Sequence, residues 1–119
     1  MHEGRKNGPA PEAGTGWECD KLSTEGPEAH FAGYIGKLAN GTLQGGMLNG
    51  MLLDSWECYS QTWTQKMEGE FSERMGYELR SWLPALVGYV IDNPETTSRF
   101  LLDWRRVIND LFANKFYRR

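Results

Sequence analysis

A chain of 119 residues with a formal net charge of −3 has the length of one ordinary domain, and it lacks the positive charge that general binders of nucleic acid or membrane surfaces need. Its apolar fraction of 39% and aromatic fraction of 13% are enough for a folded core and argue against a disordered chain. No apolar run approaches the roughly 20 residues of a membrane-spanning helix, and the first residues lack the apolar region of a signal peptide.

The beginning of the chain is rich in glycine and proline and almost free of apolar side chains, which predicts a flexible lead over residues 1–16. A helix over about residues 25–39 is predicted next, because Ser23 or Thr24 can cap it and Gly41 can follow its end. Apolar side chains recur along it at helical spacing and predict a buried face. They are Phe31, Tyr34, Ile35 and Leu38, with His30 on or near the same face.

Two shorter helices are predicted further along the chain. Thr62 or Thr64 can cap the first of them, and Gly76 can end it. The side chains that share its predicted buried face are Met67, Phe71 and Met75. The second falls within residues 81–89, where Pro84 suits the first turn of a short helix.

The longest predicted helix covers about residues 94–115. Asn93 or Asp92 can cap it, Pro94 fits its first turn, and Glu95 lies at the positive end of the helix dipole. Its apolar side chains follow one face and predict a buried stripe. They are Phe100, Trp104, Val107, Ile108, Leu111 and Phe112.

A short apolar run, residues 51–53, lies between Gly50 and the polar Asp54 and predicts a buried β-strand. A lone strand cannot satisfy its own backbone hydrogen-bonding groups, so we expect it to need neighbouring strands that this chain does not supply. Strands alternating with helices are typical of parallel α/β sheets and of barrels, which need about 250 residues when complete. The sequence therefore predicts the α/β class, as a helix-rich fragment with one or two parallel strands.

Two acidic side chains follow this predicted strand directly. Asp54 and Glu57 would lie at its carboxyl end, where α/β folds place their active sites. Glycosidases use a pair of carboxyl groups, one as acid and one as base or nucleophile. The aromatic neighbours Trp56, Tyr59 and Trp63 could stack on sugar rings. The alternative is a solvated acidic loop whose tryptophans pack on the core.

A second acidic cluster, Glu18, Asp20 and Lys21, precedes the first predicted helix. It could contribute a carboxylate or a hydrogen bond to the same cleft. The alternative is a polar helix entry with a local ion pair. Carboxylates such as Asp20 or Asp54 could also hold calcium, although no loop of consecutive ligands is present.

The two cysteines, Cys19 and Cys58, lie far apart in the sequence and have no metal-ligand spacing around them. Idle thiols are the favoured interpretation, and a disulfide between them is the alternative. Neither histidine has a partner that indicates catalysis. Gly45 and Gly46 lack the further residues of a phosphate-binding loop.

Several motifs follow one another in a fixed order along the chain. They are Gly16-Trp17-Glu18-Cys19-Asp20-Lys21-Leu22-Ser23, His30-Phe31-Ala32-Gly33-Tyr34-Ile35, Leu53-Asp54-Ser55-Trp56-Glu57, Gln61-Thr62-Trp63-Thr64, Gly76-Tyr77, Leu83-Pro84-Ala85-Leu86 and Arg99-Phe100-Leu101-Leu102-Asp103-Trp104-Arg105-Arg106. In this order and with these gaps, residues 14–117 resemble the catalytic region of glycoside hydrolase family 106, the α-L-rhamnosidases and their relatives.

The resemblance implies a (β/α)8 barrel that hydrolyses terminal α-L-rhamnosides with inversion, using two glutamates and a bound calcium ion, in an extracytoplasmic compartment. Residues 17–119 would then be a fragment of that barrel, with a rhamnose-containing carbohydrate as substrate and the remainder of the barrel as partner. We expect the fragment alone to be inactive. The alternative is a small helical, tryptophan-rich binding or interaction module without catalysis.

Carried onto this sequence, the resemblance makes Glu57 the foremost active-site carboxylate, supported by Asp54. Pocket residues implied by the matching motifs are Trp56, Gln61, Trp63, Glu18, Asp20 and Lys21. Whether Glu57 acts as acid or base stays open. The partner carboxyl group of an inverting enzyme lies roughly 6.5–9.5 Å away, and it is either Glu18 or a group outside this chain.

Overall fold

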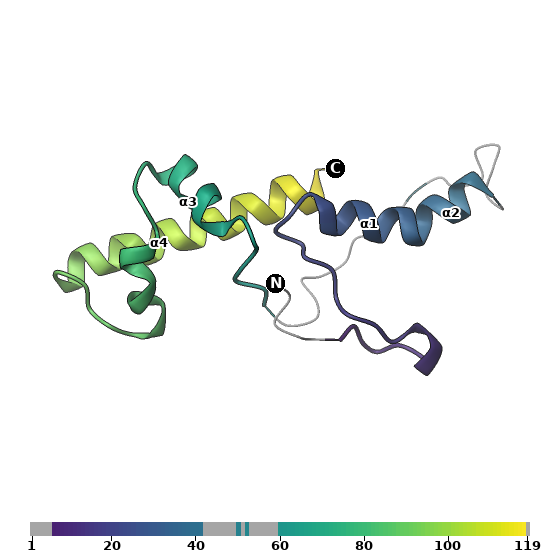
Figure 1. Cartoon of the computed structure of the whole chain (residues 1–119), viewed down its shortest axis with the longest axis horizontal. Helices are drawn as coiled ribbons and strands as arrows, with labels where there is room; N and C mark the ends of the chain where they lie inside the picture. The colour runs from purple at the N-terminus through teal and green to yellow at the C-terminus, as the bar shows by residue number, and fades with distance from the viewer. Residues whose placement is uncertain (1–5, 42–49, 51, 53–59, 119) are drawn as a thin grey trace.

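The computed structural model describes residues 6–41, 50, 52 and 60–118 (Figure 1). The helical elements in chain order are the 3-10 helix η1 (Glu12–Gly14), α1 (Glu25–Gly33), α2 (Ile35–Asn40), α3 (Met67–Met75), the 3-10 helix η2 (Arg80–Val87), α4 (Pro94–Leu111) and the π-helical η3 (Phe112–Tyr117). None of the helices in these parts of the chain is both long and apolar enough to cross a membrane.

The molecule is elongated, with principal extents of 58 × 29 × 20 Å and a radius of gyration of 17.7 Å. A compact chain of this length would have a radius of gyration of about 13–14 Å. Figure 1 shows the reason: α3, α4 and η2 form one body, and α1 and α2 extend from it toward the opposite end of the long axis. The hydrophobic core is therefore built mainly by the second half of the chain, with Leu22 added from the first half.

The core forms where α3 and η2 pack against α4. Phe71 of α3 lies at its centre, fully buried, with its ring centroid 5.0 Å from that of Tyr77, 5.8 Å from that of Phe100 and 6.3 Å from that of Trp104. The buried apolar residues are Leu22, Met67, Phe71, Leu79, Ala85, Phe100, Trp104, Val107 and Leu111. The predicted apolar faces of α3 and α4 are thus confirmed, with Met75, Ile108 and Phe112 half-buried at the margin.

Local signals set the ends of α4. The Asn93 side chain accepts a hydrogen bond from the Thr96 backbone N–H at 2.9 Å, and Pro94 occupies the first turn, where no N–H is needed. The predicted cap and start are confirmed. The end differs, because α4 gives way to η3 at Phe112 and the helical path continues to Tyr117.

Polar side chains join the elements around this core. Glu70 of α3 accepts hydrogen bonds from Arg74 at 2.5 Å and from Lys115 of η3 at 3.2 Å, all three partly buried. Tyr77 donates to Asp103 of α4 at 3.2 Å. Burial and the Asp103 carboxylate raise the pKa of Tyr77 to about 12, so its hydroxyl stays a donor across the neutral range.

The prediction for the start of α3 is wrong in one respect. The residue before the helix is Lys66, and no side chain caps the first turn. The Thr64 backbone carbonyl accepts a hydrogen bond from the Met67 N–H at 3.1 Å. The Thr64 hydroxyl donates to the Asp20 carboxylate instead of capping the helix. The predicted end is confirmed, since Gly76 has a φ of 78°, which favours glycine.

Two further helix predictions need correction. Pro84 was expected in a first turn but lies inside η2, which begins at Arg80. The helix predicted over residues 25–39 is formed as α1 and α2, with a break at Tyr34. Its apolar face does not become core, because no residue of α1 or α2 is buried, and His30 is exposed.

The α/β prediction is met only in its helical part. Over the ranges that the structure describes there is no β-strand, and the one β-bridge joins Lys6 to Trp17 in antiparallel fashion. The strand predicted over residues 51–54 lies outside the described residues, apart from Leu52, which is exposed and not in a strand. Next to the bridge, the Asn7 N–H donates to the Gly16 carbonyl at 2.9 Å. The boundary between lead and domain at residues 16 and 17 stays a prediction.

A close backbone approach fixes the start of α1. A Cβ atom added at Gly26 would lie 2.2 Å from the Asp20 carbonyl oxygen, so the G26A variant must displace the Asp20 loop. We expect it to lower the free energy of unfolding in urea by more than about 2 kcal/mol. Gly33, in the same helix, has open space around it and supplies the control. G33A should change the free energy by less than about 1 kcal/mol, and equal effects of the two variants would contradict this reason.

Candidate functional site

Two segments about forty residues apart in sequence meet at the Gln61 carboxamide. The Lys21 backbone N–H donates to Gln61 Oε1 at 2.9 Å. Gln61 Nε2 donates to the Asp20 carboxylate through a short hydrogen bond and to the Trp63 carbonyl at 3.2 Å. Because Gln61 is 9% exposed, these bonds replace water and hold the loop 18–22 against residues 60–64.

The Asp20 carboxylate is the acceptor at the centre of this contact. Its Oδ1 also accepts from the Leu22 backbone N–H at 3.0 Å, and its Oδ2 accepts from the Thr64 hydroxyl at 2.7 Å. Thr64 is fully buried. Asp20, Gln61 and Thr64 together form what we term the polar clamp. Such charge-assisted hydrogen bonds are stronger than neutral ones, so the clamp fixes the relative position of the two segments.

An ion pair lies beside the polar clamp. Lys21 Nζ is 3.0 Å from Glu18 Oε1, and the Lys21 side chain is 8% exposed, compared with 19% for that of Glu18. The ammonium group also lies 6.0 Å from the centre of the Phe116 ring at the end of η3. Glu18 Oε1 accepts a further bond from the Cys19 backbone N–H at 3.0 Å. The buried ammonium is therefore paired, as a charge away from water must be.

The environment of Glu18 determines its charge state. Burial acts to raise the pKa of Glu18, but the hydrogen bond and charge of Lys21 and the Cys19 backbone N–H outweigh it and lower that pKa below its usual 4.5. Glu18 is therefore a carboxylate at neutral pH. It is suited to hold a cation or accept a proton, and unsuited to donate one.

This shift predicts a pH dependence of stability. A carboxyl group with a lowered pKa in the folded state stabilises the fold above its unfolded value of 4.5, and that contribution is lost as the pH falls through the folded pKa. We expect E18Q to be less stable than the parent at pH 7, with a difference that shrinks below pH 4.5. Urea unfolding at several pH values measures it. E12Q, at an exposed position, is the control, and a gap that does not change with pH would contradict the assignment.

Comparison with known proteins agrees with the motif pattern. Residues 2–119 match the sequence profile of glycoside hydrolase family 106, described as alpha-L-rhamnosidase. The chain belongs to this family. A relative from Formosa agariphila, which carries the provisional name beta-glucuronidase, is 43% identical over 116 residues, covering 96% of this chain and 10% of its own length.

A solved structure agrees in fold as well as in sequence. The rhamnosidase from Novosphingobium sp. PP1Y superposes with a TM-score of 0.81 at 38% identity, covering 94% of this chain and 11% of its own. The chain thus spans about a tenth of the length of these family 106 relatives. Its helix-rich fold corresponds to one part of a rhamnosidase.

The structure gathers some of the predicted site residues of this family 106 chain and leaves others untested. Glu18, Asp20, Lys21 and Gln61 lie together, and their predicted role in a substrate cleft stays a prediction. Trp63 instead packs half-buried on the core, with its ring centroid 6.1 Å from that of Trp104. The remaining predicted residues lie outside the described part of the chain; they are Asp54, Trp56 and Glu57.

Sequence reasoning missed one member of the polar clamp. Thr64 was expected to cap a helix, but its hydroxyl bonds to Asp20 across the chain. Capping a helix and bonding to Asp20 both require a small side chain with a hydroxyl just before the helix, so the local sequence cannot distinguish the two roles. Its place in the motif shared with Gln61 is the one hint that the sequence offers.

Neither the cysteines nor a metal add chemistry to the described site. Cys19 is a free thiol, and burial raises its pKa, which disfavours the reactive thiolate; Cys58 lies outside the described residues. Within the same ranges, no three His, Cys, Asp or Glu side chains gather as metal ligands. The Asp20 oxygens already accept hydrogen bonds, so the described residues do not fit a calcium ion.

Proposed function

We propose that this chain is part of a glycoside hydrolase that removes terminal α-L-rhamnose from glycans or glycosides. The observation that carries the proposal is the likeness to the Novosphingobium rhamnosidase, at 38% identity and a TM-score of 0.81 over 94% of the chain. Identity at this level over nearly the whole segment, together with the family match, supports a shared reaction type. The full activity belongs to a polypeptide about ten times longer.

The proposed architecture is a (β/α)8 barrel to which residues 17–119 contribute helices and one or two parallel strands. The predicted strand over residues 51–54 would end at the Asp54–Glu57 segment. Active sites of such barrels lie at the carboxyl ends of their strands, which would place this segment at the catalytic face. The rest of the barrel would come from the remainder of the polypeptide.

Within this proposal, Glu57 is a catalytic carboxylate, and Asp54 and Trp56 line the same pocket. Glu18 is unsuited to be the acid of the pair, because the lowered pKa keeps it ionised. Its ion pair with Lys21 also engages the carboxylate. The partner of Glu57 is therefore proposed to be either Glu18 acting as the base or a carboxyl group from outside this chain.

The polar clamp has a separate proposed role. The oxygen and the nitrogen of the Gln61 carboxamide are both engaged within the chain, and so are both carboxylate oxygens of Asp20. We assign these two side chains to positioning the loop that carries Glu18 and Lys21, next to the segment that leads from Glu57. Trp63 supports the same segment from the core side. Glu18 and Lys21 remain the proposed sugar-contacting side chains of this loop, and that contact would require their ion pair to open.

Calcium and an extracytoplasmic location remain expectations that the family resemblance implies. A calcium ion would need ligands from outside the described residues, because the oxygens of Asp20 accept hydrogen bonds there.

Turnover of chromogenic glycosides tests the substrate class. A family 106 polypeptide that carries this chain should release p-nitrophenol from p-nitrophenyl α-L-rhamnoside, while the 119 residues alone should not. The name of the Formosa relative favours one second candidate, cleavage of β-glucuronides. Release from p-nitrophenyl β-D-glucuronide without release from the rhamnoside would replace the proposal with that one. Release from neither would favour a binding module.

A further inference from the structure

The α1–α2 arm (residues 25–40) stands apart from the core body. None of its residues is buried, and its main packing is of α1 against α2. Within the described ranges its first turn is anchored: the Gly26 backbone N–H donates to the Ser23 hydroxyl at 3.0 Å, and Gly26 lies against the Asp20 backbone. Figure 1 shows the remainder extending away from α3 and α4. The outer part of the arm, residues 29–40, thus has little support within the described chain.

Large apolar side chains on the arm face solvent. Phe31 is 47% exposed and Tyr34 is 60% exposed, three residues apart across the break between the helices. The Phe31 ring lies across the bare backbone of Gly36, where an added Cβ would be 3.5 Å from it. Leaving two aromatic rings in water forfeits the free energy that their burial would supply, and neighbouring exposed apolar groups mark interaction surfaces.

Helices this short do not stabilise themselves. α1 has nine residues and α2 has six, whereas isolated helices shorter than about 12–15 residues are marginal in water. The arm also contains Gly26, Pro27, Gly33 and Gly36, which lower helix propensity further. A stable arm therefore requires a surface to pack on.

In the solved rhamnosidase, nearly nine tenths of the chain lies outside the matched segment and is available to provide that surface. The superposition covers 94% of this chain, and the part left uncovered is shorter than the arm, so at least part of the arm has a counterpart in that structure. That counterpart belongs to a chain of which the matched segment is 11%. The occupant that the length of these relatives favours is therefore the remainder of such a polypeptide.

We infer that the α1–α2 arm is a docking surface for the remainder of a family 106 polypeptide, and that Phe31 and Tyr34 are its anchors. The partner surface is apolar, because it must cover two aromatic rings. The inference concerns assembly of the domain and holds for either candidate substrate. Failure of the rhamnoside assay would leave it untouched.

Amide hydrogen exchange tests the docking. In the isolated chain, residues 29–40 should exchange within about tenfold of unstructured rates, whereas α3 and α4 exchange slowly. The same residues should exchange at least about a hundredfold more slowly once this chain replaces the matching segment of the Novosphingobium rhamnosidase. The double variant F31S/Y34S should lose that protection in the chimera and leave the unfolding midpoint of the isolated chain unchanged.

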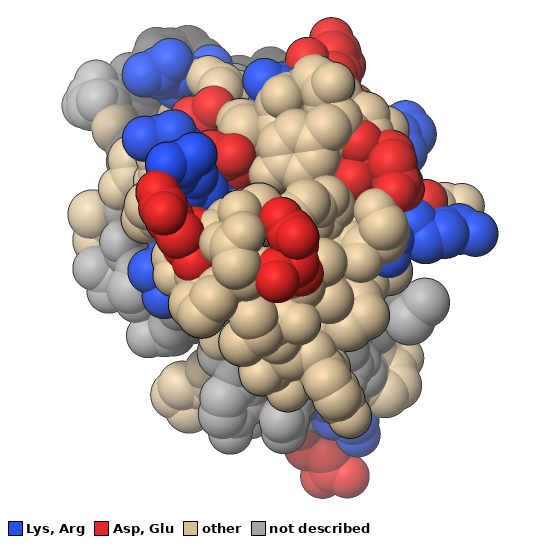
Figure 2. Space-filling model, turned by 90° about the vertical axis from the view of Figure 1, so that its left-hand side faces the viewer, with Lys and Arg blue, Asp and Glu red and all other residues tan. Residues whose placement is uncertain are grey.

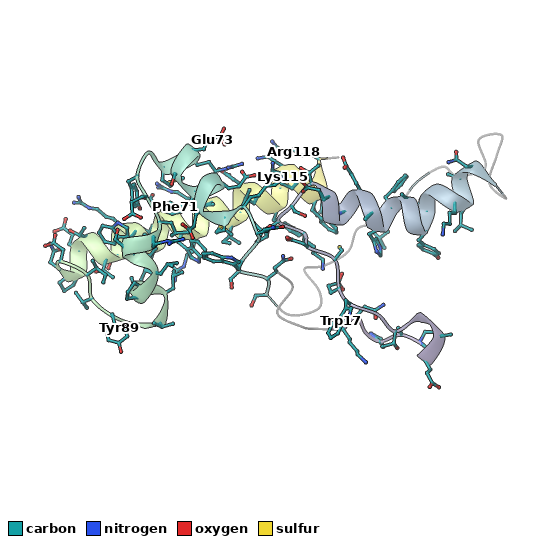
Figure 3. The ribbon with its side chains drawn as sticks, in the orientation of Figure 1. Trp17, Phe71, Glu73, Tyr89, Lys115 and Arg118 are labelled. Atoms are coloured by element: carbon teal, nitrogen blue, oxygen red, sulfur yellow. The ribbon has the colours of Figure 1, made fainter. Side chains whose placement is uncertain are left out.

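A matched control uses the exposed apolar segment at the other end of the molecule. Val87 and Tyr89 are 76% and 66% exposed. Figure 3 labels Tyr89 at the end of the molecule that Figure 2 turns toward the viewer. V87S/Y89S should leave exchange at residues 29–40 unchanged in the chimera. If the chimera does not fold, amide exchange of the matching segment is measured in the unmodified rhamnosidase. Fast exchange of that segment would overturn the inference.

Two results with the isolated chain would also overturn it. Slow exchange of residues 29–40 in a monomer would show that the arm needs no partner. A dimer in light-scattering chromatography that dissociates in F31S/Y34S would assign the surface to a second copy of the chain. A monomer with a rapidly exchanging arm supports the proposed occupant.

Discussion

Replacing Glu57 by glutamine is expected to lower the turnover of an aryl α-L-rhamnoside by about 10²–10⁴-fold in a family 106 polypeptide that carries this chain, with the fold unchanged. Glutamine keeps the shape of glutamate, but it can neither donate nor accept a proton as a carboxyl group does. Steady-state kinetics of the variant and the parent, at equal melting temperature, measure the effect.

The control for this experiment is E73Q, at an exposed position of α3 that Figure 3 labels. It makes the same chemical change away from the proposed site and should leave turnover as it was. Near-normal turnover by E57Q would remove Glu57 from catalysis. A catalytic carboxylate would then have to be sought elsewhere in the polypeptide, while membership of the family would stand.

Replacing Phe71 by alanine is expected to cost about 3–5 kcal/mol of the free energy of unfolding. Phe71 is fully buried and packs on Tyr77, Phe100 and Trp104, so its removal leaves a cavity that three rings line. Domains of this size have total stabilities of about 5–15 kcal/mol. The variant should therefore be near the limit of folding, as urea unfolding followed by circular dichroism would show.

The matched control is Y89A, which removes an aromatic ring that is 66% exposed. Figure 3 shows the contrast, with Phe71 in the body of the molecule and Tyr89 on the outer loop before α4. We expect Y89A to change the free energy of unfolding by no more than about 0.5 kcal/mol. Comparable losses in both variants would mean that the core does not centre on Phe71.

Local signals made part of this fold predictable. α4 begins where a capping asparagine precedes a proline, and α3 ends at Gly76, because both features depend on residues within one turn of each other. The apolar stripe of α4 was readable for the same reason, since helical periodicity puts Phe100, Trp104 and Val107 on one face. Collinear motifs likewise sufficed to indicate the family, which the profile match confirmed.

Burial of the first predicted helix could not be read in the same way. The spacing of Phe31, Tyr34 and Ile35 indicates an apolar face but not whether this chain provides its partner. In the structure the described residues leave that face largely open, and Tyr34 lies at a break between α1 and α2. A periodic pattern shows that a helix has an apolar face to bury. Whether another part of the chain covers that face depends on the tertiary structure.

The candidate site shows the same division. The sequence by itself determined which chemistry is available: carboxylates at Glu18, Asp20 and Glu57 in motifs typical of a glycosidase family. The ion pair of Glu18 with Lys21 joins residues three apart and is one of the two alternatives that the sequence left open. Only the tertiary structure decided how Asp20 is used, since Gln61 engages it from forty-one residues away. Residue types fix the donors and acceptors on offer, but a buried hydrogen bond depends on which distant segment folds against them.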